Sequence, residues 1–273
     1  MSSINTNVGA MVALQNLKST NSQLAKVQDQ VSTGLKVGSA ADNAASWAVA
    51  ETMRSDISSL KAVGDGLSMA KATVGVGREA AESVADVLGQ IKDKLAQARN
   101  SNVDRGKITD EINQLSNQFD SIVGSAQFNG ENVINGTGTM EVLASIDRDN
   151  AGAVTTSTID VTRQDLSTAI DLSTVDLTDE STIDTSITAV EGFIDTAVDA
   201  AAALGSAESR IGIQEDFVGK LTDAMDAGVS SLVDADMTEA SAELKALQTQ
   251  QQLGVQAMSI ANQAPQNLLQ LFR

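Results

Sequence analysis

A seven-residue apolar repeat runs through most of this chain of 273 residues, and such spacing predicts helices that pack along one face. One run comprises Met53, Leu60, Leu67, Val74, Ala81, Leu88 and Leu95. A second run comprises Ile183, Val190, Ala197, Leu204, Ile211, Val218, Met225 and Leu232. Between them, steps of four and three residues connect Ile108, Ile112, Leu115, Phe119 and Ile122. We therefore predict a mainly α fold, a long antiparallel helical bundle or coiled coil.

Two further apolar stripes occupy the ends of the chain, in registers that do not continue the central one. They contain Ala10, Leu17, Leu24 and Val31 at one end, and Met237, Ala240, Leu244, Leu247, Met258 and Ala261 at the other. The sequence thus predicts a separate terminal coiled-coil pair (residues 1–43 and 237–273) and a central bundle (residues 44–236). Two flexible linkers are expected between them, containing Gly34, Gly38, Asp42, Asp234 and Asp236. Ser39 or Asp42 is expected to cap the helix that follows.

Neither terminal stripe has enough chain around it to complete a core, so we predict that copies of the chain assemble through these ends. The expected polymerisation interface consists of Ile4, Leu17, Leu24, Val27, Val31, Leu244, Leu247, Val255, Met258, Leu268, Leu269 and Leu271.

The stretch 129–182 has a different character. Asn129-Gly130 and Asn135-Gly136 are turn dipeptides, and residues 140–146 and 154–161 are typical of short strands. We predict a β-hairpin at about 139–162. Residues 162–182 are rich in Thr, Ser and Asp, which predicts a surface loop.

Composition argues against several kinds of chemistry. The chain has no His, Cys or Tyr, so most of the usual catalytic groups and soft-metal ligands are missing, and we expect no enzyme, no cofactor and no metal. Asp147 to Gly152 begins like a calcium loop but lacks its later ligands, so a plain turn is favoured. A net charge of -18 makes nucleic acid and anionic membranes improbable partners.

Two polar or aromatic features have local interpretations. Trp47 is interpreted as a packing anchor at the start of a helix. Gln250, Gln251 and Gln252 stand where a heptad favours apolar groups. They could form a solvated face, or they could form hydrogen bonds between subunits.

Several segments resemble bacterial flagellin, over roughly residues 1–130 and 185–273. They are Ile4 to Asn7, Asn16-Leu17, residues 32–44, Asp65-Gly66, Phe128 to Gly130, and the tail 261–273. The resemblance implies that the terminal helices form the inner core of a tube and the central helices its outer layer. Only a short segment separates the two regions, so this is identified as a short flagellin without outer domains.

The resemblance also implies partners and a location. It implies an extracellular flagellar filament for swimming motility, formed as a homopolymer or as a co-polymer with other flagellins. Export without a cleavable signal peptide is expected, with an export chaperone, a filament cap and hook-associated junction proteins as partners. A flagellin-like junction or adaptor protein is the alternative, and an unrelated helical scaffold or enzyme is a third.

One departure from the family pattern concerns the segment recognised by the innate flagellin receptor. Here it reads Gly89 to Gln97, with Gln90 in place of an Arg and Lys94 in place of a Leu. Weak or no receptor activation is therefore expected. Residues 155–188, rich in Ser and Thr, are candidates for O-linked sugars.

Overall fold

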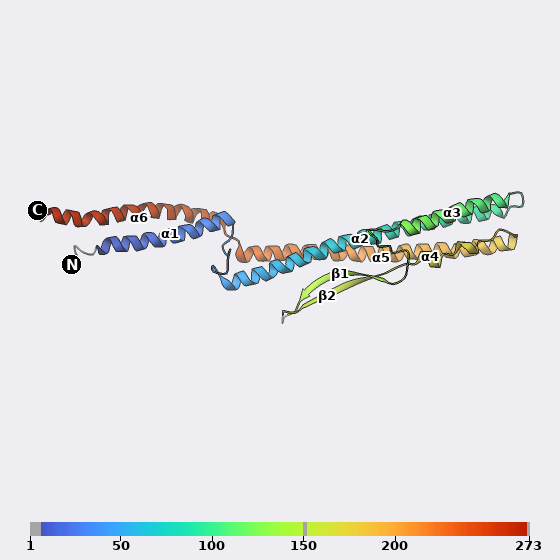
Figure 1. Cartoon of the computed structure of the whole chain (residues 1–273), viewed down its shortest axis with the longest axis horizontal. Helices are drawn as coiled ribbons and strands as arrows, with labels where there is room; N and C mark the ends of the chain where they lie inside the picture. The colour runs from blue at the N-terminus through green and yellow to red at the C-terminus, as the bar shows by residue number, and fades with distance from the viewer. Residues whose placement is uncertain (1–6, 150–151, 272–273) are drawn as a thin grey trace. The chain divides into compact units, whose positions relative to one another are not determined.

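The computed structural model describes residues 7–149 and 152–271, and side chains as far as residue 263. Over these residues the chain forms six α-helices, one two-stranded sheet and one 3-10 turn (Figure 1). In chain order the elements are α1 (Val8–Thr33), α2 (Ala44–Ala98), α3 (Arg105–Ser125), β1 (Thr139–Arg148), β2 (Val154–Thr162), α4 (Leu166–Ala169), η1 (Leu172–Thr174), α5 (Glu180–Val233) and α6 (Met237–Leu271). The predicted mainly α fold with one small hairpin is confirmed.

The chain divides into two units, which are described separately. One contains residues 1–55 and 224–273, and the other contains residues 56–223. The division therefore falls within α2 and α5, whereas the sequence pattern placed its boundaries at residues 43 and 236.

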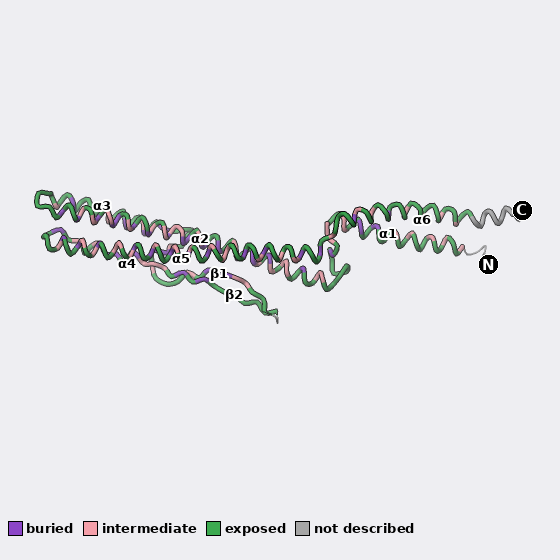
Figure 2. The backbone as a smooth tube through the Cα atoms, turned by 180° about the vertical axis from the view of Figure 1, so that it is seen from behind, coloured by how far each residue is buried: buried purple, intermediate pink, exposed green. Residues whose placement is uncertain are grey.

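In the unit 56–223, α2 and α5 run antiparallel. Lys71 near one end of this part of α2 pairs with Glu215, whereas Arg99 beyond its other end pairs with Asp184. The heptad residues of both helices are buried, as the purple segments of Figure 2 indicate. They are Leu60, Leu67, Val74, Ala81, Leu88, Leu95, Ile183, Val190, Ala197, Leu204, Ile211 and Val218.

The third helix, α3, packs as its alternating pattern predicted over most of its length. The Asp104 side chain caps it by accepting from the Gly106 amide, and Lys94 of α2 pairs with Glu111 of α3 at 2.5 Å. Ile108, Ile112 and Phe119 are buried. At the last turn the buried residue is Val123, while Ile122 is only partly covered.

Strands β1 and β2 form the predicted hairpin, with Met140 opposite Val161 and an irregularity in register between Leu143 and Ser145. The hairpin is attached to the long helices by polar contacts. Gln214 Nε2 donates to the carbonyl oxygen of Ala144 at 2.9 Å, and Arg148 Nη2 lies 2.8 Å from Asp56 Oδ1. Residues on one face of the hairpin are buried, among them Val142 and Val161.

The prediction of a plain surface loop at 162–182 was wrong. This stretch contains α4 and η1, and it buries Leu166, Ile170 and Leu177. Asp165 and Asp171 cap the two short elements through their side chains. The Thr, Ser and Asp residues that indicated a loop thus serve as caps and turns, while isolated apolar residues anchor the segment.

In the unit formed by the two ends of the chain, α1 and α6 lie side by side (Figure 1). Leu24, Val27 and Leu247 form a small buried core, and Val31 and Leu244 pack against it. In the same unit, the predicted heptad position Leu232 is exposed, whereas Val229 and Val233 are buried. A straight α-helix drifts by about 20° per heptad relative to a strict repeat of seven, so a long apolar stripe rotates out of the seam.

The start of α2 also differs from expectation. Asn43, rather than Ser39 or Asp42, accepts a hydrogen bond from the Ser46 amide at 3.2 Å and caps the helix. Asp42 instead accepts bonds from the backbone and hydroxyl of Ser39. Trp47 lies in the first turn of α2 and is half-buried.

Candidate assembly interface

The residues predicted to mediate polymerisation fall into three groups in the structure. Leu24, Val27 and Leu247 are buried inside the α1–α6 pair, with Val31 and Leu244 around them, so they form a core within one chain. The second group, Leu17, Val255 and Met258, retains exposed surface. Ile4 lies outside the described residues, as do the side chains of Leu268, Leu269 and Leu271.

Close approach of α1 and α6 depends on a residue without a side chain. A Cβ added at Gly254 would meet Leu17 Cδ1 at 3.2 Å, so Leu17 packs directly against the backbone of α6. Leu17 is therefore mainly a contact within the pair. Val255, by contrast, is more than half exposed.

Exposed apolar side chains, which the heptad count missed, form an outer apolar face on each helix of the pair. On α1 it contains Val8, Met11 and Val12, whose exposed fractions are 66%, 64% and 52%. On α6 it contains Leu253 and Ile260, seven residues apart and 58% and 69% exposed. Figure 2 shows that exposed residues predominate along both helices. The spacing i, i+3, i+4 of Val8, Met11 and Val12 was the signal that could have found this face.

Polar side chains fix how the two terminal helices align. Asn7 Nδ2 donates to the carbonyl oxygen of Ala261 at 2.7 Å, and its Oδ1 accepts from the Ala10 amide at 3.1 Å. Gln251 Nε2 donates to Asn21 Oδ1 at 2.8 Å. Gln251 thus bonds within the chain, which neither interpretation of the glutamine run foresaw, while Gln250 and Gln252 are exposed.

The two predicted linkers are hydrogen-bonded to each other. Gly34 ends α1 with a φ of 75°, a conformation that glycine adopts at little cost. Leu35 forms an isolated antiparallel bridge with Asp234. The Lys36 amide donates to the Val233 carbonyl at 2.7 Å, and the Ala235 amide donates to the Gly34 carbonyl at 2.9 Å.

Two linker carboxylates accept hydrogen bonds from neighbouring residues. Asp236 caps α6, because its Oδ1 accepts from the amides of Thr238 and Glu239 at 2.8 and 3.3 Å, and these bonds lower the pKa of Asp236. Hydrogen bonding from Ser39 lowers the pKa of Asp42, and Lys26 lies 3.7 Å away. No neighbouring atom approaches Gly38 closely enough to contact an added Cβ.

The described ranges 7–149 and 152–271 lack two other kinds of feature. No helix there combines the length and apolar character needed to cross a membrane. The same ranges contain no group of three or more acidic side chains placed to hold a metal ion.

Long paired helices, with apolar side chains both in the seam and on the outer faces, define a class of helical structural proteins. Residues 4–139 match the bacterial flagellin N-terminal helical region, and residues 187–272 match the bacterial flagellin C-terminal helical region. The chain belongs to the bacterial flagellin family. Members of this family are structural proteins of the extracellular flagellar filament and not enzymes.

Three full-length relatives support this assignment. Flagellin C of Rhizobium meliloti (strain 1021) is 41% identical over 320 residues, covering 100% of both chains. Flagellin FljM of Caulobacter vibrioides is 40% identical over 281 residues, covering 100% of this chain and 99% of the relative. The flagellin of Brucella melitensis is 40% identical and covers 100% of both chains. A crystal structure of Bacillus cereus flagellin superposes with a TM-score of 0.47 and 24% identity, covering 55% of this chain and 86% of that chain.

Proposed function

We propose that this chain, a structural subunit of the flagellar filament, polymerises by burying the outer faces of its α1–α6 pair against neighbouring copies. The proposal rests on one observation: the α1–α6 pair has apolar side chains both between its two helices and on its outside. Leu24, Val27 and Leu247 already hold the two helices together. Met11 and Ile260, on the outside, still expose most of their surface.

The free energy available from this surface is large enough to drive assembly. Burying one Met, Val, Leu or Ile side chain contributes about 1.5 to 3 kcal/mol. Six such side chains, Val8, Met11, Val12, Leu253, Val255 and Ile260, are at least half exposed. Their burial would offset the ordering of the terminal helices, which we propose are only marginally stable in the free subunit.

A head-to-tail contact of this kind suits a filament. Contacts between two different surfaces of identical subunits generate an open helical polymer when the rotation between subunits does not close a ring. We propose that residues 1–43 and 237–273 act as one inner domain and residues 44–236 as an outer domain. The paired linkers at Leu35 and Asp234 would keep the two strands of chain together at the joint.

The test distinguishes the exposed outer side chains from those buried between α1 and α6. Met11→Gln and Ile260→Gln replace exposed apolar side chains with helix-compatible polar ones, so subunits should fold normally. The concentration needed for elongation of filament seeds should rise about tenfold for each 1.4 kcal/mol lost. Lys18→Gln, also on α1 and exposed, is the matched control and should elongate seeds as the wild type does. Wild-type elongation kinetics in both apolar variants would refute the proposed interface.

Membership of the family also supports a set of partners and a route of export. We propose that the chain assembles alone or together with related flagellins, and that an export chaperone, a filament cap and junction proteins handle it. Export would proceed in an unfolded form without cleavage. The intact mass of filament protein recovered from culture medium tests the last point, and a shortened N-terminus would contradict it.

Weak activation of the innate flagellin receptor is the last part of the proposal. Gln90 is exposed on α2, and the Lys94 ammonium is held 2.5 Å from Glu111 of α3. The segment therefore presents an amide and a tethered cation where the family pattern has an Arg and a Leu. Purified monomer should produce little signal in a receptor reporter assay, and Gln90→Arg with Lys94→Leu should increase it. A strong wild-type response would refute this part.

A further inference from the structure

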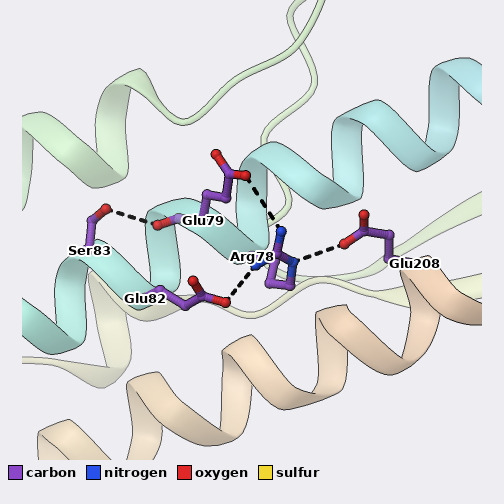
Figure 3. Close-up of polar contacts among 5 residues, drawn as sticks. All are labelled: Arg78, Glu79, Glu82, Ser83 and Glu208. Atoms are coloured by element: carbon purple, nitrogen blue, oxygen red, sulfur yellow. Dashed lines mark hydrogen bonds and ion pairs between the residues drawn. The ribbon is translucent and has the colours of Figure 1, made fainter.

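Four ion pairs join α2 and α5 at a regular spacing. Lys71 pairs with Glu215 at 3.2 Å, Arg78 with Glu208 at 2.9 Å, Lys92 with Glu191 at 2.6 Å, and Arg99, just beyond α2, with Asp184 at 2.8 Å. The basic residues occupy successive heptad positions except one, where the chain has Ala85. Figure 3 shows the ion pair that precedes Ala85 in the repeat. Here Arg78 contacts Glu208 of α5 as well as Glu79 and Glu82 of its own helix.

At Ala85, where no such ion pair joins α2 and α5, the surface has an apolar hollow with acidic residues at its edge. The hollow has a volume of about 420 Å³ and is lined by Glu82, Ala85, Asp86, Val198, Ala201 and Ala202. Val198 is 51% exposed and lines the hollow together with Ala85. Glu82 is bonded to Arg78, whereas Asp86 is exposed and carries no ion pair among the described residues. We call this surface the acidic hollow.

A complementary surface lies further along α5. Ile213 and Phe217 are four residues apart and 67% and 55% exposed. Arg210 stands three residues before Ile213, and Lys220 stands three residues after Phe217. Both basic residues are exposed, and neither forms an ion pair within the described part of the chain. We call Arg210, Ile213, Phe217 and Lys220 the basic stripe.

We propose that the basic stripe of one copy docks in the acidic hollow of a second copy, with Phe217 against Ala85 and Val198 and with a basic group near Asp86. Charge complementarity selects a second copy as the occupant, because the hollow is acidic and the stripe is basic. The stripe stands out on a chain of net charge -18, whose surface is mostly acidic. Basic and apolar groups occur together and unpaired in the stripe. Exposed apolar surface rimmed by polar residues is typical of protein contact sites.

The contact cannot form within one molecule. Residues 202 and 217 are on one continuous helix, about 22 Å apart at 1.5 Å per residue. Two different surfaces therefore meet between copies, and the contact repeats from subunit to subunit. This inference rests on the proposed function, but it concerns residues 56–223, whereas the proposed function depends on α1 and α6.

Disulfide trapping tests the contact, because the natural chain contains no cysteine. Ala202→Cys and Phe217→Cys are combined in one chain, added to wild-type seeds, and oxidised mildly after elongation. A disulfide requires Cα atoms within about 7 Å, so these two cysteines can only join neighbouring copies. We expect a ladder of covalent multimers that disappears on reduction. Each single-cysteine variant alone should give no ladder, and a mixture of the two should stop at dimers.

Controls make each outcome decisive. Ala202→Cys with Asp223→Cys, also on α5, should remain monomeric after oxidation. Filaments of the Ala202→Cys, Phe217→Cys chain that show no ladder would overturn the docking contact and leave the proposed function standing. A product of the doubly substituted chain that stops at dimers would overturn the repeating arrangement. Failure of the wild-type chain itself to elongate seeds would instead count against the proposed function.

Charge exchange provides a measurement that does not depend on cysteine. Asp86→Lys alone and Lys220→Glu alone should each slow seed elongation, by about tenfold at low salt. The double exchange should return the rate to within about twofold of the wild type. Asp120→Lys, an exposed acid on α3, is the control for the change in net charge and should have little effect. Equal effects of all three single variants, without restoration in the double exchange, would also overturn the proposal.

Discussion

Asn7 connects the two ends of the chain through a single side chain. Its Oδ1 caps α1 by accepting from the Ala10 amide, and its Nδ2 donates to the carbonyl oxygen of Ala261 in α6 at 2.7 Å. Residues 254 positions apart are thus held in register by one amide group.

The two roles of Asn7 can be separated by substitution. Asn7→Ala removes both hydrogen bonds and should destabilise the helix pair by about 1 to 2 kcal/mol. Asn7→Asp keeps the capping acceptor but loses the donor to Ala261, and should lie between the wild type and Asn7→Ala. Thermal dissociation of filaments, followed by light scattering, measures the order. Equal midpoints for Asn7→Asp and Asn7→Ala would show that the cap contributes nothing.

Two glycines of α2 provide a matched pair for testing core packing. A Cβ on Gly77 would lie 2.2 Å from Val133 Cγ2, whereas nothing lies within 4 Å of a Cβ on Gly89. Gly77→Ala should therefore destabilise the subunit, because overpacking costs about 1 to 3 kcal/mol and outweighs the gain in helix propensity. Gly89→Ala should stabilise it by about 0.5 to 1 kcal/mol. Urea unfolding measures both, and stabilisation by Gly77→Ala would contradict the close contact with Val133.

The linker should weaken at acid pH. The amides of Thr238 and Glu239 lower the pKa of Asp236, so its cap contributes stability that is present above the ordinary aspartate pKa. This stability is lost as the pH falls below about 4 and through the lowered pKa. Protection of the first turn of α6 from hydrogen exchange should decrease in that window. Asp236→Asn retains a capping side chain and should remove this pH dependence; an unchanged profile in the variant would contradict the assignment.

Attachment of the hairpin depends on Arg148. Its Nη2 lies 2.8 Å and its Nε 3.4 Å from the two carboxylate oxygens of Asp56. Arg148→Ala should release the tip of the hairpin and increase its cleavage by a nonspecific protease several-fold. Arg148→Lys retains the charge but not the two-point contact, so its cleavage rate should be intermediate. Wild-type resistance in Arg148→Ala would indicate that Gln214 and the apolar face are sufficient.

The sequence predicted the helices because periodicity is a local property. Leu67 and Leu88 belong to the repeat of α2, and Ile183 and Ile211 belong to the repeat of α5. The spacing places each pair on one face of its own helix, and all four residues are buried. The hairpin was equally predictable, since turn residues at 149–152 separate two short runs of strand-forming residues.

The sequence was less informative where one residue type can occur in more than one kind of structure. Thr, Ser and Asp in 162–182 indicated a loop, yet Leu166, Ile170 and Leu177 anchor that segment in the structure. Leu24 and Leu247 were predicted to lie in contacts between subunits, and within one chain they already belong to one small buried core. An apolar stripe has the same appearance whichever helix covers it.

By itself, the sequence determined where the five long helices of the described chain form, which side of each is apolar, and that the chain lacks most of the usual catalytic groups. Tertiary structure alone decided that the linkers pair at Leu35 and Asp234, that Val229 and Val233 replace Leu232 in the core, and that Met11 and Ile260 remain outside the α1–α6 pair. The physical reason is that helix formation depends on neighbours within a few residues. Which stripe is covered depends on contacts between segments hundreds of residues apart, and a repeat of seven does not specify them.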